Sequence, residues 1–291
     1  MAQSSLSLAE KTFILHGVDA DFRTDGRSRL EYRALEIETN IMPQTNGSVR
    51  LKIANTDVLV TVKVELDTPS LDRPNEGKLE FFVDCSANAA PEFEGKGGEE
   101  LGTKISNVLS NAYRSASTLD LKVLSILPSK KCWKMYVDVL ILQCDGNLID
   151  AIGAAVKCAL FATEIPKVLT AAVDGDDIDL QLSDDPFDCV KLNVENYPVL
   201  VTLCKIGDNF VVDPTADEEL YAAASLVMSV TPNGRVTSIV KTGYGSLQPS
   251  TLIKTVECGK EVGKRLNDRL MEALRKEEAT GPHRPIFGFL R

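Results

Sequence analysis

The segment Val137–Ala159 constrains the fold more than any other part of the sequence. An apolar run typical of a buried strand leads through the turn Asp145-Gly146 into a second apolar run with helical character. A helix that begins after such a turn commonly binds phosphate, because its free N–H groups and its dipole favour negative charge. The side chains that open this helix include no cation: Asn147, Leu148, Ile149 and Asp150. The segment therefore predicts an enzyme-like architecture whose anion site is empty.

Length and composition indicate a soluble globular protein with reduced thiols. The 291 residues are 44% hydrophobic, which is enough for a sizeable core. No apolar run approaches the roughly 18 residues that cross a bilayer, so no membrane partner is expected. The seven cysteines include no C-x-x-C pair, which argues against zinc and against a disulfide framework. The net charge of −10 repels a polyanion, so any contact with RNA has to be local.

The acidic segment Asp174–Asp188 is expected to be a solvated linker rather than a calcium site. An EF-hand loop needs glycine at its sixth position and glutamate at its twelfth. Asp179 and Asp185 occupy those positions here. We therefore predict no metal site.

Apolar periodicity and turn residues predict an α+β protein of two similar halves, each with strands first and helices after. Expected strands of the first half cover 30–39, 49–54, 57–66, 78–86, 121–127 and 134–143. Its helices are expected over about 99–114 and from the Asp145-Gly146 turn to Ile165. The second half is expected to contain a smaller sheet, a helix near Asp217–Val227 and a long helix from about Pro249 to Glu278.

The predicted domain boundaries follow from these elements. They are 1–29 for an N-terminal helix with an arginine-rich turn, 30–167 for the first domain, 168–189 for the acidic linker, 190–280 for the second domain and 281–291 for the tail. The tail is expected to be loosely held.

Side chains suited to acid–base chemistry are sparse. The two histidines, His16 and His283, lie near the ends of the chain, so a nucleophile–histidine site has little support. Asp213 and the pair Glu218-Glu219 lie at a strand-to-helix junction, where acidic residues are also ordinary partners of a helix dipole. Structural use of these carboxylates is favoured.

Three basic segments each allow two interpretations. Arg23–Arg33 suits RNA phosphates or an acidic partner, and equally suits pairing within the fold. Lys130–Lys134 surrounds the single tryptophan, which either stacks a base or belongs to the core. The Gly97–Gly102 loop resembles a phosphate-binding loop, but Thr103-Lys104 reverses the order that such a loop requires. A flexible helix entry is therefore favoured over a phosphate contact by Lys96.

Four motifs taken in order are more specific than any one of them: Arg23-Thr-Asp-Gly-Arg27, Ala54-Asn-Thr-Asp57, Pro91-Glu-Phe-Glu-Gly-Lys-Gly-Gly98 and Asp145-Gly-Asn-Leu-Ile-Asp-Ala151. Together they resemble the RNase PH superfamily from about Leu8 to the final helix, and more narrowly its exosome ring subunits. The resemblance implies an RNase PH-like α+β fold with mixed and antiparallel sheets and a long C-terminal helix. It also implies a hexameric ring through whose pore RNA is threaded, with an RNA-binding cap and docked hydrolytic nucleases.

The resemblance further implies where a catalytic member keeps its chemistry. Phosphorolytic relatives follow the acidic-glycine turn with a Thr/Ser-Arg pair that binds inorganic phosphate, and those positions are Leu148 and Ile149 here. Isoleucine cannot replace a bidentate guanidinium. Relatives also place an aspartate beyond the acidic pair of the second half, and that position is Ser225. Both substitutions imply an inactive subunit with no catalytic residue, no metal and no cofactor.

The function implied is that of a non-catalytic structural subunit of the exosome core ring, which supports 3′-to-5′ RNA processing and degradation, including rRNA maturation and mRNA turnover. The implied partners are other RNase PH-like ring subunits, the RNA-binding cap subunits and RNA, with Lys96, Lys104 and Arg114 as candidate RNA contacts. The implied localisation is nucleus, nucleolus and cytoplasm. The alternative is a phosphate-dependent 3′-to-5′ exoribonuclease that uses Asp213 and Glu218 in an altered site, and a third hypothesis is a free-standing RNA-binding module.

Overall fold

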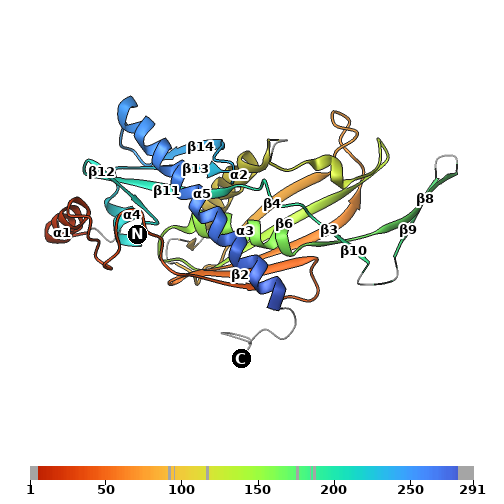
Figure 1. Ribbon diagram of the computed structural model, residues 1–291, viewed down its shortest axis with the longest axis horizontal. Coiled ribbons are helices and arrows are strands. Elements are labelled where there is room, and N and C mark those ends of the chain that lie inside the picture. The colour runs from red at the N-terminus through yellow and green to blue at the C-terminus, as the bar shows by residue number, and fades with distance from the viewer. Residues whose placement is uncertain are drawn as a thin grey trace.

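The computed structural model describes residues 6–90, 93–94, 96–115, 118–174, 177–183, 185 and 188–280. A larger sheet and a smaller sheet share one buried helix, and a long C-terminal helix packs on the smaller sheet and continues past the edge of the larger one (Figure 1). The expected α+β class with mixed and antiparallel sheets is confirmed. The predicted tail, 281–291, lies outside the described residues.

The first sheet has the order β1-β2-β3-β6-β4, and β5 pairs with β6. Its strands are β1 (Leu35–Thr39), β2 (Gly47–Ile53), β3 (Thr56–Asp67), β4 (Lys78–Cys85), β5 (Ser125–Leu127) and β6 (Lys131–Gln143). Strand β4 runs parallel to β6, whereas the other pairs are antiparallel. Alternation sets the buried face, because Val58, Val60 and Val62 are fully buried while Leu59 and Thr61 are half-buried.

The second sheet is antiparallel and has the order β12-β11-β13-β14. Its strands are β11 (Val199–Ile206), β12 (Asn209–Val212), β13 (Ala224–Val230) and β14 (Val236–Thr242). Nearly every residue of β11 and β13 is buried, because these central strands are covered on both faces. The short helix α4 (Ala216–Tyr221) joins β12 to β13 and begins with a capping box between Thr215 and Glu218.

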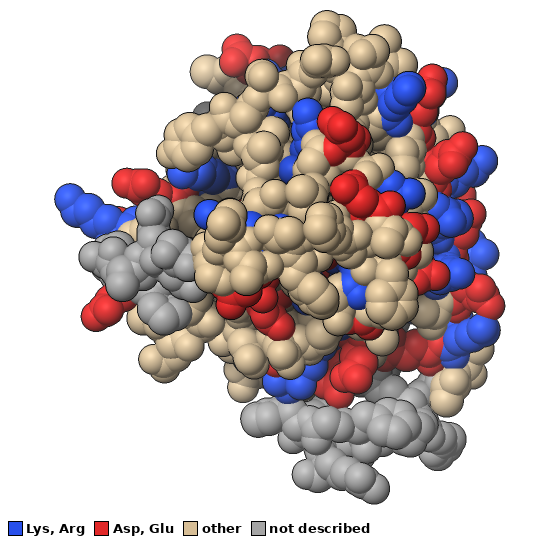
Figure 2. Space-filling view, turned by 90° about the vertical axis from the view of Figure 1, so that its left-hand side faces the viewer, with Lys and Arg blue, Asp and Glu red and all other residues tan. Residues whose placement is uncertain are grey.

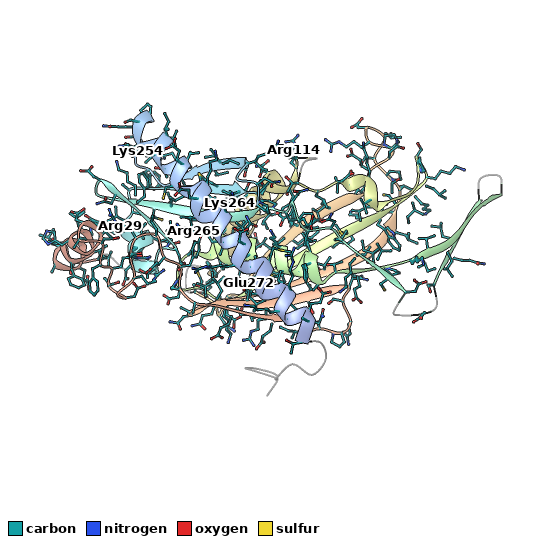
Figure 3. The ribbon with its side chains drawn as sticks, in the orientation of Figure 1. Arg29, Arg114, Lys254, Lys264, Arg265 and Glu272 are labelled. Carbon is teal, nitrogen blue, oxygen red and sulfur yellow. The ribbon has the colours of Figure 1, made fainter. Side chains whose placement is uncertain are left out.

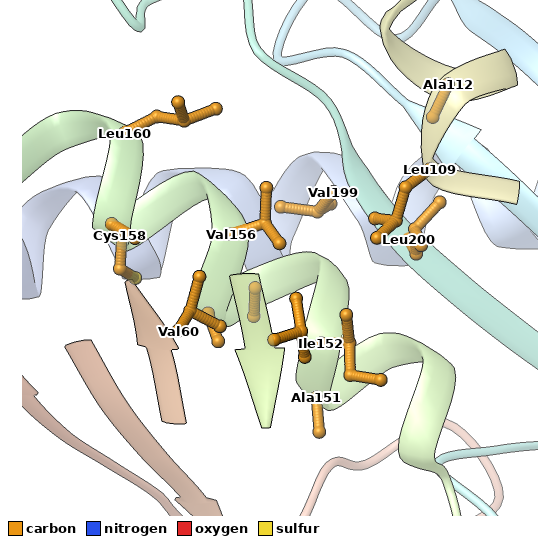
Figure 4. Packing of buried hydrophobic residues seen from close by; sticks show 14 of the residues in the cluster. Val60, Leu109, Ala112, Ala151, Ile152, Val156, Cys158, Leu160, Val199 and Leu200 are labelled. Atoms are coloured by element: carbon orange, nitrogen blue, oxygen red, sulfur yellow. The ribbon is translucent and has the colours of Figure 1, made fainter. Parts of the chain in front are cut away.

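The remaining helices are α1 (Leu8–Asp19), α2 (Lys96–Tyr113), α3 (Leu148–Ala162) and α5 (Pro249–Thr280), with a 3₁₀ turn at Leu121–Leu124. Ser7 and Glu10 form a capping box at the start of α1, and the motif can be read from the sequence. Helix α3 is buried along almost its whole length between the two sheets. Figure 4 shows its side chains packed against Val60 of β3, Leu200 of β11 and Leu109 of α2.

A buried lysine ties α3 to α5. The Nζ atom of Lys157 donates to the carbonyl oxygen of Tyr197 at 2.8 Å and to Oδ1 of Asn267 at 2.6 Å. The Lys157 side chain is not exposed, and this burial lowers its pKa to about 8. The hydrogen bond between Lys157 and Asn267 therefore joins α3 to α5.

Several predicted boundaries were wrong in ways that have local causes. The strand expected over 30–39 begins only at Leu35, because residues 27–33 are held by a charge cluster described below. Four of the seven residues of the strand expected over 121–127 form the 3₁₀ turn, which Asp120 caps. Helix α3 ends at Ala162, since Glu164–Pro166 (β7) pairs instead with Cys189–Lys191 (β10).

The acidic linker predicted for 168–189 contains a hairpin of two strands, β8 (Val168–Asp174) and β9 (Asp177–Leu182). In Figure 1 this hairpin extends from one end of the molecule. Acidic composition suggested solvated coil, but VLTAAV is almost entirely apolar and apolar residues alternate in DIDLQL, and both patterns support strand pairing across a turn.

Candidate functional site

Charged side chains gather where three connecting segments meet beside α4 and β12. The segments are residues 21–33 after α1, the turn 145–147 before α3, and the β12–α4 connection, residues 212–219. Figure 1 shows α1, α4 and β12 together at one end of the molecule. We call the group the Asp213 cluster and define it as Arg23, Arg27, Arg33, Asn147, Asp213, Glu218 and Glu219.

Asp213 lies at the centre of the Asp213 cluster and has no free carboxylate lone pair. Its Oδ2 atom accepts from Arg27 Nη1 at 2.8 Å, from the Arg33 backbone N–H at 2.8 Å and from Arg33 Nε at 2.9 Å. Its Oδ1 atom accepts from Arg33 Nη2 at 2.8 Å and from Asn147 Nδ2 at 2.6 Å. A carboxylate offers about four lone-pair sites, so these contacts use all of them. The side chain is fully buried and its backbone is left-handed, with φ of 49°.

Arg23 and Glu218 form a second, fully buried ion pair in the Asp213 cluster. Arg23 Nε donates to Glu218 Oε1 at 2.9 Å, and Arg23 Nη2 donates to Glu218 Oε2. The remaining donors of Arg23 bind the carbonyl oxygens of Val212 and Asp213. Every polar atom of this planar fork therefore serves to hold the segment after α1 against the β12–α4 connection.

The pairing settles the open interpretation of the Arg23–Arg33 segment. Arg23, Arg27 and Arg33 all bind carboxylates of the same chain, and Arg29 binds Asp21. The guanidinium groups of Arg23, Arg27 and Arg33 are largely buried in these pairs, whereas the pair of Arg29 and Asp21 lies at the surface. The contacts favour pairing within the fold over a basic surface for RNA.

The sequence analysis considered an anion site at the start of α3, and a carboxylate of the chain itself occupies that place. The Asn147 backbone N–H donates to Oε1 of Glu219 at 2.8 Å, so a carboxylate of the chain already lies at this end of α3. Gly146 has φ of 80°, and a Cβ there would lie 2.6 Å from the backbone N of Ala216. Only glycine fits this close approach.

Leu148 and Ile149 behave as core residues. Leu148 is 7% exposed and Ile149 is half-buried, and both pack in the main hydrophobic cluster. They bring no donor to the start of α3. Their correspondence to the phosphate-binding pair of catalytic relatives stays a prediction.

Asp150 follows in the first turn of α3 and is 1% exposed. It accepts from the Thr202 backbone N–H at 3.0 Å, from Thr202 Oγ1 at 2.6 Å and from the Tyr32 hydroxyl at 2.8 Å. Burial nevertheless raises its pKa to about 6, against the lowering effect of these hydrogen bonds. Asp150 thus links α3, β11 and the segment before β1.

A helix was expected over Asp217–Val227, and this expectation was wrong for Ser225. Helix α4 ends at Tyr221, and Ser225 belongs to β13, where its Oγ atom lies 3.0 Å from Sγ of Cys204. The physical reason is burial, because Leu226–Val230 fills the centre of the second sheet between β11 and β14. Its role as a replaced aspartate stays a prediction.

The candidate RNA contacts lie along one helix. Lys96 opens α2, Lys104 lies in its middle and Arg114 directly follows it, and all three side chains are exposed. The loop expected around Gly97 is helical, and Gly102 lets α2 approach β4, since a Cβ there would lie 2.5 Å from the Val83 carbonyl oxygen. Gly102 therefore serves packing.

Two further features bear on chemistry. Trp133 is buried in the core and is not a stacking platform. Among the residues that the structure describes, no group of three or more His, Cys, Asp or Glu side chains has a metal-binding arrangement, and no helix is both long and apolar enough to cross a bilayer.

Sequence reasoning missed the parts that Arg33 and Asn147 play. The segment 23–33 contains four arginines and the segment 213–219 contains four acidic residues, and this opposite charge was the available signal. The separation of about 190 residues hid the pairing, because nothing local connects the two segments.

Comparison with models of known protein families shows to which family the chain belongs. Residues 31–166 match domain 1 of the 3′ exoribonuclease family RNase PH, and residues 196–262 match its domain 2. The chain belongs to the RNase PH family. The first match spans β1 to β7, and the second spans β11 to part of α5.

Relatives place the chain more narrowly within the RNase PH family. A protein of Dictyostelium discoideum named putative exosome complex exonuclease RRP42 is 33% identical over 318 residues, which covers 93% of this chain and 98% of the relative. Exosome complex component Rrp42 of Sulfurisphaera tokodaii is 32% identical over 276 residues, which covers 94% and 96%. The chain is an RNase PH family member of the Rrp42 type, as the resemblance implied.

Solved structures agree on the fold. A chain of the Archaeoglobus fulgidus exosome with RNA bound to the active site superposes with a TM-score of 0.78 at 26% identity, covering 90% of this chain and 97% of that one. Rice Rrp46 superposes with a TM-score of 0.63 at 16% identity, covering 87% and 100%. The RNase PH-like fold is thereby confirmed.

Proposed function

We propose that this chain is a non-catalytic structural subunit of an exosome core ring, which supports 3′-to-5′ RNA processing and degradation by the complex. Its Rrp42-type relatives are named exosome complex components, and the similar Archaeoglobus chain comes from an exosome that holds RNA. The proposed partners are other RNase PH-like ring subunits, RNA-binding cap subunits and RNA that passes through the ring.

The occupied carboxylate of Asp213 carries the non-catalytic part of the proposal. A general acid or base needs a lone pair or a proton within reach of the substrate. Asp213 instead receives five hydrogen bonds from Arg27, Arg33 and Asn147, and Glu218 is fixed by Arg23. The carboxylates that an altered active site would use are therefore bound within the fold.

Exposed apolar residues support a role within an assembly. Leu8 and Phe13 of α1 are 83% and 67% exposed, and Phe22 just beyond is 67% exposed. Figure 2, which faces this end of the molecule, shows Lys and Arg mixed with Asp and Glu rather than gathered in one basic patch. Such a surface fits a protein partner better than it fits a free-standing RNA-binding module.

Co-purification tests the assembly. The full chain, tagged and isolated at mild salt, should carry further RNase PH-like subunits in constant proportion. Replacement of Phe13 and Phe22 by serine should reduce their yield if this end meets a neighbour. A chain that purifies alone at every salt concentration would contradict the proposal. We also propose that tagged protein localises to nucleus, nucleolus and cytoplasm, which imaging would test.

A phosphate-dependent exoribonuclease is the second candidate, because the Dictyostelium relative is named an exonuclease. Such an enzyme must bind inorganic phosphate. Calorimetric titration of the full chain with phosphate should show no saturable heat, since Leu148 and Ile149 supply no cation and Arg33 is committed to Asp213. Saturable phosphate binding by the wild-type chain would favour the enzyme.

A further inference from the structure

A groove of about 520 Å³ runs between α5 and the segment 30–37. Its apolar lining includes Leu35 and Ile37 of β1 and Leu266 and Leu270 of α5. It is separate from the interior of the Asp213 cluster, although Arg33 borders both. The groove is open to solvent and is lined by the segment 30–37 on one side and by three turns of α5 on the other, so it suits a chain segment better than a small molecule.

The outer edge of β1 lies along this groove. Strand β1 is the first strand of its sheet and, among the residues that the structure describes, pairs with β2 alone. The Asn40 N–H turns toward β2 and donates to the Ser48 carbonyl, whereas the Thr39 N–H turns outward. Alternation along the strand places the N–H groups of Leu35 and Ile37 on the same outer edge as that of Thr39. Within the described parts of the chain, no group accepts a hydrogen bond from these two.

At both ends of the open edge, a carboxylate of the chain accepts a hydrogen bond from a backbone N–H group. The Arg33 N–H donates to Oδ2 of Asp213 at 2.8 Å, and the Thr39 N–H donates to Oε1 of Glu277 at 3.1 Å. The open donors of Leu35 and Ile37 lie between these occupied positions. An unpaired edge of this kind is a template for an added strand.

Two arginines on α5 give the groove its charge. Arg265 and Arg269 lie one turn apart, line the groove and are exposed. Neither forms an ion pair within the described residues. Glu31 is the acidic residue in the lining, and its carboxylate accepts from the Ser28 N–H. Figure 3 shows Arg265 and Lys264 on different flanks of α5, so the cations of this helix do not all face the groove.

We propose that the groove binds an extended acidic segment of a partner protein, which adds as a strand to the outer edge of β1. Its carbonyl groups accept from the Leu35 and Ile37 N–H groups, its apolar side chains lie on the groove floor, and its carboxylates pair with Arg265 and Arg269. RNA fits less well, because a strand edge is completed by a peptide and because the chain carries a net charge of −10.

Fluorescence anisotropy on the full chain tests this binding. The probe is a labelled peptide in which valine and glutamate alternate over about eight residues, with a valine–lysine peptide for comparison. Saturable binding of the acidic peptide alone is expected. Arg265→Glu/Arg269→Glu should weaken it at least about tenfold, because two attractive charges become repulsive. Lys260→Glu/Lys264→Glu makes the same change of charge outside the groove and should alter affinity less than about twofold.

A second pair of variants separates strand addition from charge alone. Ile37→Pro removes the outward N–H but no bond to β2, and Ile37→Ala removes the side chain only. If a strand is added, the proline variant binds at least about tenfold more weakly than the alanine variant, with both folded by circular dichroism. The proposal would be overturned if the wild-type chain did not bind the acidic peptide, or if the Arg265/Arg269 variant bound it unchanged. Equal binding by the proline and alanine variants would also overturn it, as would single-stranded RNA that competed for the groove as well as the unlabelled acidic peptide does.

Discussion

Arg33 and Asp213 contact each other through both carboxylate oxygens, with Nε at 2.9 Å from Oδ2 and Nη2 at 2.8 Å from Oδ1. The two residues are 180 positions apart and belong to the two halves of the fold. Arg33 also donates to the carbonyl oxygens of Asp145 and Gly146. One guanidinium therefore holds together the segment before β1, the turn before α3 and the β12–α4 connection.

Removing the charge of Asp213 should be strongly destabilising. Asp213→Asn leaves the largely buried Arg33 without its counterion and leaves Arg27 with Asp25 alone, and breaking such a buried pair typically costs about 3–5 kcal/mol. Urea denaturation at pH 7 measures this cost. Asp25→Asn is the matched control, because Asp25 also pairs with Arg27 but is 32% exposed, and a loss below about 1 kcal/mol is expected there. Equal losses of unfolding free energy for the two variants would contradict a central structural role for Asp213.

The buried Arg23–Glu218 pair should show strong coupling. Arg23→Met and Glu218→Gln each leave one partner unpaired and should each cost about 3–5 kcal/mol, whereas the double variant should cost clearly less than their sum. The same cycle on Lys191 and Glu278, both about half exposed, should give coupling below about 0.5 kcal/mol. Additive losses at Arg23 and Glu218 would contradict the burial of the pair.

Asp150 should make the protein less stable as pH rises. Its pKa in the folded protein, about 6, lies above the ordinary value of 3.8, so the folded state binds the proton more tightly than the unfolded state. This contribution is fully present below about pH 3.8 and is lost as pH rises through about 6. Asp150→Asn should therefore gain stability relative to wild type between pH 4.5 and pH 7.5, by at most about 3 kcal/mol. A constant difference in urea midpoints over that range would contradict the raised pKa.

Lys157 should have a pH effect of opposite sign. Burial lowers its pKa to about 8 from 10.5, so the folded state releases the proton more readily and this group adds stability as pH rises from about 8 toward 10.5. Lys157→Met should destabilise by about 1–3 kcal/mol at pH 7.5, because Asn267 and Tyr197 lose a buried donor, and by more at pH 10. The exposed Lys167→Met variant should show no such increase.

The sequence predicted the fold better than the site. Alternation in β3, the capping box of Ser7 and the periodicity of α5 are local signals, and each marks its element within a few residues. The error at Asp217–Val227 came from good helix formers that are buried as a strand, since β11 and β14 supply partners on both sides of β13. Tertiary context overrode the local preference there.

The Asp213 cluster shows why the site was harder. Arg33 and Asp213 are ordinary surface residues by composition, and only the packing of the two halves makes them a buried pair. The absence of a cation at Leu148 and Ile149 was readable from the sequence, but the occupation of the same region by Glu219 and Asn147 was not. Long-range polar contacts leave no periodic signal in the chain.

The central claim is that the Asp213 carboxylate is structural and that the chain does not degrade RNA itself. The most direct measurement is release of nucleoside diphosphates from single-stranded RNA by the purified full chain with inorganic phosphate and magnesium, beside Asp213→Asn. The account predicts no release above a no-protein blank for either protein. Phosphate-dependent release by wild type that disappears in a folded Asp213→Asn variant would contradict it.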